Sequence, residues 1–258
     1  MKIAVLLTGM PRYLDTNKVL MKDFFKGHEV DYFCHAWFDK TKKTEEKSWH
    51  KTNINIDPHT EEKIVNIFKP KNYLLEPQRQ FELPRNYNYN TGFQQPFFIV
   101  YSHFYSVKTA NMLRLAYEKE TGVKYDVVFK LRYDLFIGNK LRWEQYDLNK
   151  LYLHDNCNTW SELYDNVSFN DMIAFSKPEN MNVYCDVFDN IDNMYMNNQM
   201  RFSCENFVAY QLLSHDIDVV PIYFTRALLL RENNTFDLSV GIRYQMNDLE
   251  KLICHNND

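Results

Sequence analysis

The chain has 258 residues, of which 45% are hydrophobic and 16% aromatic, and its formal net charge is -4 at pH 7. This length and apolar content are sufficient for one large domain with a buried core, and the negative charge argues against nucleic-acid partners. Only 6 glycines occur, and no two lie within six residues of each other. The dinucleotide fingerprint, the P-loop and the hydrolase nucleophile elbow are therefore excluded.

The cysteine and histidine patterns exclude further classes of protein and site. The 5 cysteines include no C-x-x-C pair, and the 8 histidines form no H-E-x-x-H motif. Neither a disulfide framework nor a common zinc site is expected. The apolar stretch after Met1 is too short for a signal peptide, and no run of about 18 apolar residues is present. We therefore expect a cytoplasmic protein with no transmembrane segment.

The first residues predict a β-α-β unit. Lys2–Leu7 is a continuous apolar run of the kind found in central parallel strands. Apolar residues at helical spacing follow over 16–26, and the composition of 29–35 is typical of a second strand. The unit spans about 35 residues, the size expected for this motif.

A polar, lysine-rich loop over 38–56 comes next. Asp57-Pro58 predicts the start of a helix, with Asp57 as N-cap, and Lys69-Pro70 ends that helix. The elements predicted after it are a strand over 72–75, a long loop over 78–91, a long helix over 94–120 that ends before Gly122, and a strand over 125–131.

The pattern beyond residue 138 is less regular. Ser176-Lys177-Pro178-Glu179 has the form of a capping box that opens a helix to about residue 195. The other expected elements are strands over 151–153 and 172–175, a helix over 203–213 capped by Ser203, and late strands over 219–224 and 227–230. We predict one α/β domain over 1–258, with a mixed sheet that is flanked by helices and mostly parallel in its N-terminal half.

Polar residues follow two of the predicted parallel strands, where open sheets bind their ligands. After the first strand, Gly9 permits close approach of the backbone, and Arg12 offers a fork for phosphate oxygens. The alternative is a tight turn with a solvated arginine. After the second strand, His35 and Trp37 are candidates for stacking on a base or sugar, and ordinary packing in the core is the alternative.

Charged residues follow the strand over 125–131. Asp134 is a candidate ligand for Mn²⁺ or Mg²⁺, which need only one or two protein carboxylates, and Arg132 would neutralise phosphate or orient Asp134. A local ion pair is the alternative. Asp171 and Glu205 are candidate general bases for an attacking hydroxyl. The alternatives are a turn residue at 171 and a first-turn acid favoured by the helix dipole at 205.

Five motifs, taken in order, resemble small GT-A-type nucleotide-sugar glycosyltransferases of bacterial surface-polysaccharide clusters, large DNA viruses and phages. They are L-L-T-G-M-P-R at 6–12, D-Y-F-C-H-A-W at 31–37, Y-D-V-V-F-K-L-R-Y-D at 125–134, N-D-M-I-A-F-S at 170–176 and C-E-N-F-V-A-Y-Q-L-L at 204–213. One departure is clear: Arg132 stands where better-known relatives have the first Asp of Asp-x-Asp.

The resemblance implies a Rossmann-like GT-A fold in which residues 1–138 bind the nucleotide sugar, residues 139–235 bind the acceptor and residues 236–258 form a C-terminal tail. It implies transfer of a sugar from a nucleoside-diphosphate donor to a hydroxyl of a glycan or similar acceptor. Such an enzyme would act in polysaccharide or glycan biosynthesis, in the cytosol of a bacterium or of a virus-infected host cell.

The resemblance assigns three roles to residues of this sequence. The implied roles are donor binding by Gly9, Arg12, His35, Trp37 and Arg132, cation binding by Asp134, and catalysis by Glu205, Asp171 and Arg132. Both inverting and retaining chemistry remain open. Two other functions also remain open: a non-catalytic nucleotide- or glycan-binding module, and another α/β transferase.

Overall fold

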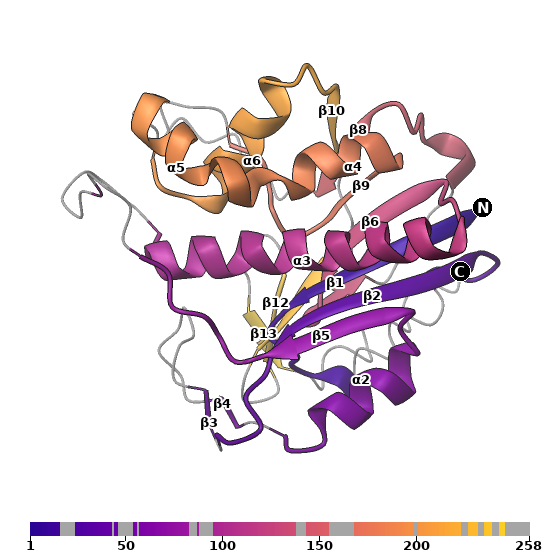
Figure 1. Ribbon diagram of the computed structural model, residues 1–258, viewed down its shortest axis with the longest axis vertical. Helices are drawn as coiled ribbons and strands as arrows, with labels where there is room; N and C mark the ends of the chain where they lie inside the picture. Colours follow the sequence, from indigo (N-terminus) through magenta and orange to yellow (C-terminus); the bar gives the residue numbers. More distant parts are fainter. Residues whose placement is uncertain are drawn as a thin grey trace.

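The protein has an α/β architecture in which helices flank a seven-stranded mixed sheet (Figure 1). This confirms the predicted mixed sheet. The computed structural model describes residues 1–15, 24–42, 44–45, 54–55, 57–82, 87, 95–137, 143–154, 168–198, 201–222, 227–231, 235–238 and 243–245.

The seven strands follow the order β10-β8-β9-β6-β1-β2-β5. Their bounds are β1 (Lys2–Gly9), β2 (Glu29–Trp37), β5 (Asn72–Glu76), β6 (Val127–Arg132), β8 (Leu151–His154), β9 (Ala174–Ser176) and β10 (Val219–Ile222). Only β9 is antiparallel to its neighbours, and every other adjacent pair in this sheet is parallel. The prediction of a central, parallel first strand is confirmed, since β1 lies between β2 and β6.

Helices cover both faces of the sheet. One face carries α3 (Phe97–Thr121), α4 (Pro178–Cys185), α5 (Val187–Asn198) and α6 (Cys204–Leu213), and the other carries α2 (Thr60–Phe68). Alternate residues of β1 enter two separate cores: Ala4 and Leu6 pack with α3, whereas Ile3 and Val5 pack on the α2 side. Burial on both faces explains why this strand is a continuous apolar run.

Two predicted helix ends are confirmed. Gly122 caps α3 with a φ of 73°, and its N–H donates to the Glu118 carbonyl at 2.9 Å. At the start of α6, the Ser203 hydroxyl accepts a hydrogen bond from the Asn206 N–H at 3.2 Å.

Two other helix starts were predicted wrongly. The Ser176 hydroxyl does not cap a helix; Ser176 belongs to β9 and donates to the Lys150 carbonyl at 2.7 Å. Lys177 is the N-cap instead, and the single helix expected here is two helices, α4 and α5. At α2 the first helical residue is Thr60, because Asp57 forms a turn in which its carboxylate accepts from the His59 N–H at 2.9 Å.

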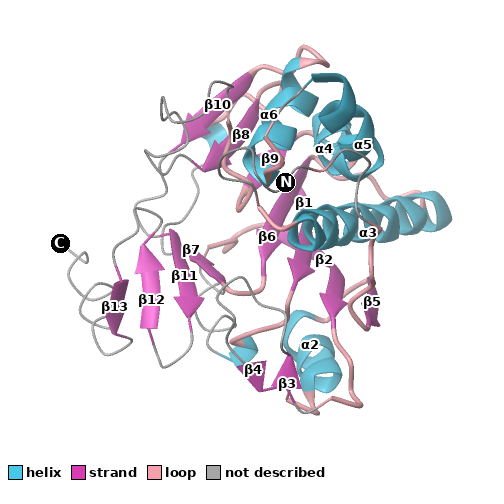
Figure 2. Ribbon diagram, turned by 90° about the vertical axis from the view of Figure 1, so that its left-hand side faces the viewer, coloured by secondary structure: helices cyan, strands magenta, loops and turns pink. Residues whose placement is uncertain are grey.

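A second, antiparallel sheet lies beside the main one (Figure 2). Its order is β13-β12-β11-β7, with bounds β7 (Leu135–Ile137), β11 (Ala227–Arg231), β12 (Thr235–Leu238) and β13 (Arg243–Gln245). Strands therefore occur within the segment expected to be a C-terminal tail. Because β7 begins directly after Asp134, this sheet also fixes the exit from β6.

Three other expectations concern loops and a helix. Short strands β3 (Thr44–Glu45) and β4 (Ile54–Asn55) pair within the predicted loop over 38–56. Most of the predicted helix over 16–26, and most of the predicted loop over 78–91, lies outside the described residues. A short 3₁₀ turn at Trp143–Gln145 was not predicted.

Candidate functional site

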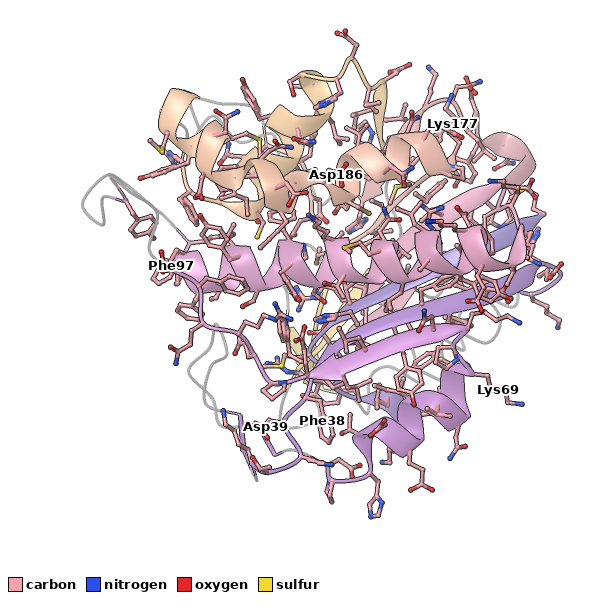
Figure 3. The ribbon with its side chains drawn as sticks, in the orientation of Figure 1. Phe38, Asp39, Lys69, Phe97, Lys177 and Asp186 are labelled. Atoms are coloured by element: carbon pink, nitrogen blue, oxygen red, sulfur yellow. The ribbon has the colours of Figure 1, made fainter. Side chains whose placement is uncertain are left out.

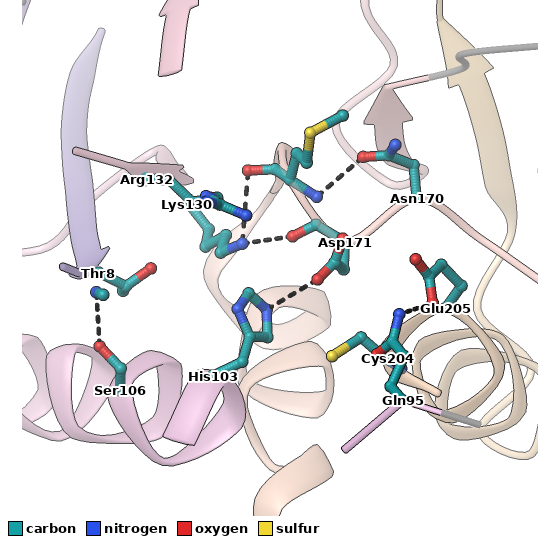
Figure 4. A network of polar contacts seen from close by, with 12 residues as sticks. Thr8, Gln95, His103, Ser106, Lys130, Arg132, Asn170, Asp171, Cys204 and Glu205 are labelled. Carbon is teal, nitrogen blue, oxygen red and sulfur yellow. Dashed lines mark hydrogen bonds and ion pairs between the residues drawn. The ribbon is translucent and has the colours of Figure 1, made fainter. Parts of the chain in front are cut away.

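The strand order reverses between β1 and β6, and this reversal defines the candidate site. From β1 the sheet extends through β2 to β5, and the chain then returns to the other side of β1 as β6. Thr8 and Arg132 are paired in the parallel register, so the turns after β1 and β6 leave the sheet side by side. Open α/β sheets bind ligands at such reversals, beyond the carboxyl ends of the strands. Polar side chains gather there (Figure 4).

Arg132 and Asp134 form a two-pronged ion pair at this point. Arg132 Nε and Nη2 donate to the two carboxylate oxygens of Asp134 at 2.8 and 2.7 Å. The Asp134 side chain is 4% exposed, whereas that of Arg132 is 29% exposed. The ion pair expected as one alternative is therefore present, and it leaves Arg132 Nη1 unused by Asp134.

A divalent cation at this point would share Asp134 with Arg132. A carboxylate has about four lone-pair sites, and the arginine takes two of them. Within the described part of the chain, no three His, Cys, Asp or Glu side chains gather into a metal-binding group. Because Mn²⁺ and Mg²⁺ keep several waters and bind phosphate oxygens, Asp134 and a diphosphate together suit such an ion.

Asp171 lies among basic groups from two neighbouring elements. Its Oδ2 is 3.3 Å from Nε2 of His103 on α3, and its main-chain carbonyl accepts a hydrogen bond from the buried Lys130 of β6. Burial alone would raise the pKa of Asp171, but nearby His103, Lys130 and Arg132 outweigh this effect and lower the pKa. Asp171 is therefore ionised at neutral pH.

Glu205 shows the opposite shift. It lies in the first turn of α6, where Gln95 Nε2 donates to its Oε2 at 2.9 Å. Burial, followed by the nearby negative charge of Asp171, raises the pKa of Glu205 to about 7. Two carboxylates whose pKa values are driven apart by their surroundings are typical of acid–base sites, and a pKa near 7 suits a general base.

A chain of hydrogen bonds connects the ends of β1, β2 and β5. The Ser106 hydroxyl of α3 accepts from the Gly9 N–H at 2.8 Å and lies 2.8 Å from His35 Nδ1. His35 Nε2 lies 3.1 Å from a carboxylate oxygen of Glu76. Since a carboxylate only accepts, the proton of a neutral His35 is on Nε2, and Ser106 donates to Nδ1. Gly9 has a φ of 98°, which few other residues adopt.

His35 and Trp37 are both buried, at 0% and 4% exposure. The Trp37 indole N–H donates to the Ser102 carbonyl at 3.2 Å, and its ring stacks on Tyr105 with an interplanar angle of 26°. These contacts favour the packing interpretation of both rings over stacking on a ligand. Arg12 is half-buried in the turn after β1, on the same edge as Arg132.

Four residues of this region were missed by the sequence reasoning: Gln95, His103, Ser106 and Lys130. Lys130 did leave a signal, since it is the one cation inside the apolar run over 125–131. A fully buried lysine needs a polar partner, so such a residue marks a built polar site. The other three sit in or beside the long helix α3, where nothing in the local pattern distinguishes them from packing residues.

The largely buried His103 makes the stability of the fold depend on pH. Burial is the main cause that lowers its pKa, to about 3 from the ordinary 6.5. Between these values the unfolded chain binds a proton at this histidine that the native protein does not, so the contribution of His103 to the free energy of unfolding falls by about 1.4 kcal/mol for each pH unit of acidification. Because the raised pKa of Glu205 gives a contribution of opposite sign over part of this range, the variant is compared with the unsubstituted protein at each pH. We expect His103→Gln to lower the slope of the free energy of unfolding against pH by about 1.4 kcal/mol per pH unit relative to the unsubstituted protein, measured by urea unfolding at pH 4.5, 5.5 and 6.5.

The same substitution at His59, whose side chain is 70% exposed, is the matched control. It should leave the pH dependence of the free energy of unfolding as it is in the unsubstituted protein. An unchanged slope in His103→Gln would contradict the assignment of the effect to this histidine.

Within the described residues, no helix has the length and apolar content required to cross a membrane. A scan of the sequence against protein-family models finds no match, and a search of curated proteins finds none either.

Proposed function

We propose that the protein is a glycosyltransferase that moves a sugar from a nucleoside-diphosphate donor to a hydroxyl group of a glycan or similar acceptor. The observation that carries the proposal is the cluster at the strand reversal. There, an arginine and a buried aspartate lie beside the Gly9 turn, and two carboxylates with opposite pKa shifts lie nearby. A leaving diphosphate requires positive charge, and an attacking hydroxyl requires a base.

The proposed roles follow from the contacts. Glu205 takes the proton of the acceptor hydroxyl, whose oxygen forms a bond to the anomeric carbon of the donor. The bond from that carbon to the diphosphate oxygen breaks, and its electron pair leaves with the diphosphate. Arg132 Nη1 and Arg12 bind the phosphate oxygens, and burial together with the ionised Asp171 keeps the pKa of Glu205 high.

Asp134 has two proposed functions in this site. It holds Arg132 in position through both carboxylate oxygens, and its carboxylate would be a ligand of a divalent cation. A bound Mn²⁺ or Mg²⁺ would supply further positive charge for the leaving diphosphate. Because the glycine-poor sequence has no glycine-rich phosphate-binding motif, we assign this task to side chains and a cation.

A thermal-shift experiment tests the proposal. Nucleoside diphosphates and their sugars should raise the melting temperature, more strongly with Mn²⁺, because a ligand that binds the native state stabilises it by about 2.7 kcal/mol at 100 times its Kd. Slow release of free nucleoside diphosphate from the responding donor would then indicate hydrolysis to water. No response to any nucleotide would overturn the proposal, and a response without hydrolysis would favour a binding module.

A further inference from the structure

A groove of about 360 Å³ lies between the segment that follows β5 and the first turn of α3. Its lining residues are Gln78, Arg79, Gln80, Phe81, Phe97 and Phe98. Figure 3 shows Phe97 at the start of the long helix, at the end that projects beyond the sheet. The volume lies within the range of small-molecule sites in proteins. None of the roles assigned above uses this groove.

The aromatic wall of the groove is held in place by packing. Phe81 stacks on Tyr101 with an interplanar angle of 18° and meets Phe188 of α5 edge to face. Phe97 meets Phe98 edge to face, at 87°. Rings fixed in this way present flat apolar surfaces to a ligand at little conformational cost, and such surfaces suit the C–H faces of a sugar ring.

The polar groups of the groove are neutral or neutralised. Arg79 donates through Nε and Nη2 to Glu76 at 3.0 and 2.9 Å, so its charge is already paired. Gln78 donates to the Ser102 hydroxyl, while its buried Oε1 has no hydrogen-bond partner in the described part of the structure. A donor hydroxyl that reached this oxygen would remove the cost of leaving a buried acceptor unpaired. These features favour a neutral, hydroxyl-rich ligand over a phosphate.

Gln95 connects the groove to the proposed base. It comes just before Pro96, the N-cap of α3, and Phe97 and Phe98 begin the helix. The Gln95 side chain donates to Glu205 and accepts from the Cys204 N–H, both at 2.9 Å. We propose that the groove binds a neutral sugar unit of the acceptor, which places the acceptor along the start of α3 next to Glu205. This assignment rests on the proposed transferase function.

A glycan array tests the groove with the intact protein. The unsubstituted protein should bind at least one class of neutral oligosaccharide, and Phe98→Ala and Gln80→Ala should each weaken that binding by at least tenfold. Phe98 is half-buried, so its loss also affects packing, whereas Gln80 is exposed and its substitution changes the groove alone. Two variants are used for this reason. The control is Met112→Ala, at a 57% exposed position on the same helix, which should bind as the unsubstituted protein does.

The thermal response to nucleoside diphosphates separates the possible outcomes. Both groove variants should keep that response while losing the glycan. Equal glycan binding by variants and unsubstituted protein, or no binding by the unsubstituted protein, would overturn the groove assignment. Loss of the nucleotide response in the variants would instead make the groove a nucleoside site. Glycan binding through the groove without any nucleotide response would overturn the transferase and leave a glycan-binding module.

Discussion

Replacing Glu205 by glutamine should lower sugar transfer by about 10²- to 10⁴-fold, the usual contribution of a general base. The amide has nearly the same shape and can still accept the hydrogen bond from Gln95, but it cannot take a proton. Because the pKa of Glu205 is raised to about 7, the proposed transfer by the unsubstituted protein should become faster with increasing pH up to about 7 and then level off. Rate measurements from pH 5.5 to 8.5 should show this rise only when Glu205 is present.

The stability of the same variant should change in the opposite direction. In the native protein the pKa of Glu205 is raised from 4.5 to about 7, so the unfolded chain ionises first and the native state loses stability as pH rises between these values. Glutamine has no such cost, and at pH 8 the variant should be more stable by up to about 3 kcal/mol. Lost activity together with gained stability would exclude misfolding as the cause of inactivity.

Glu179 provides the matched control. It is also an acid in the first turn of a helix, α4, but it is exposed. Glu179→Gln should leave both rate and stability close to those of the unsubstituted protein. Transfer by Glu205→Gln within fivefold of normal would contradict the assignment, and an inactive Asp171→Asn beside it would move the base to Asp171.

The candidate site lies at the carboxyl ends of the strands, and the general rule for parallel sheets located it better than any single motif did. Parallel strands end on one edge, where open sheets bind ligands, so the residues after β1 and β6 were candidates for the site, and the structure makes Thr8 and Arg132 neighbours in the register. The pairing of Arg132 with Asp134 was also foreseen as an alternative, because the two are only two positions apart in the sequence. Both predictions depend on local spacing and on a general rule of topology.

The electrostatic effect of Asp171 on Glu205 depends on long-range geometry that the spacing of residues in the sequence does not contain. Asp171 lies just before β9, the one antiparallel strand of the main sheet, and Glu205 lies at the start of α6. The main-chain hydrogen bond from the Phe169 N–H to the Glu205 carbonyl, 3.0 Å long, brings the two segments together. No pattern in either segment predicts that bond, and so the pKa shifts of the two acids could not be predicted either.

The failure at Ser176 has a similar cause. The sequence Ser-Lys-Pro-Glu has the form of a capping box, but the Ser176 hydroxyl finds carbonyl oxygens of the segment 148–150 once β9 joins the sheet. Carbonyl groups distant in the sequence thus took the place of the N–H groups at the predicted helix start. Helix ends without such competition, at Gly122 and Ser203, were predicted correctly.

Replacing Asp134 by asparagine should lower transfer on the order of 10³-fold, the upper range for the loss of one group that stabilises developing charge. It should also lower the free energy of unfolding by about 3 kcal/mol, because removing one partner of a buried ion pair leaves the other charge without compensation. The partial exposure of Arg132, at 29%, keeps this cost at the low end of its range. Urea unfolding and transfer rates would measure both effects.

Surface ion pairs offer a matched comparison. Lys108 pairs with Asp189, whose side chain is 50% exposed, so Asp189→Asn removes the same charge from a solvated pair. That variant should lose less than about 1 kcal/mol of stability and none of its activity. A loss at Asp134 no larger than the loss at Asp189 would contradict the importance of burial for this pair.

The double variant Arg132→Gln/Asp134→Asn separates a structural role of the pair from a role in the reaction. Two neutral amides restore a hydrogen-bonded pair without an uncompensated charge, so stability should recover over that of Asp134→Asn. Transfer should not recover, because neither amide neutralises phosphate, and the extra thermal shift with Mn²⁺ should stay absent if Asp134 holds the cation. Recovery of transfer together with stability would instead mean that the pair serves the fold alone, and the diphosphate would then have to be held elsewhere on this edge, with Arg12 the remaining candidate.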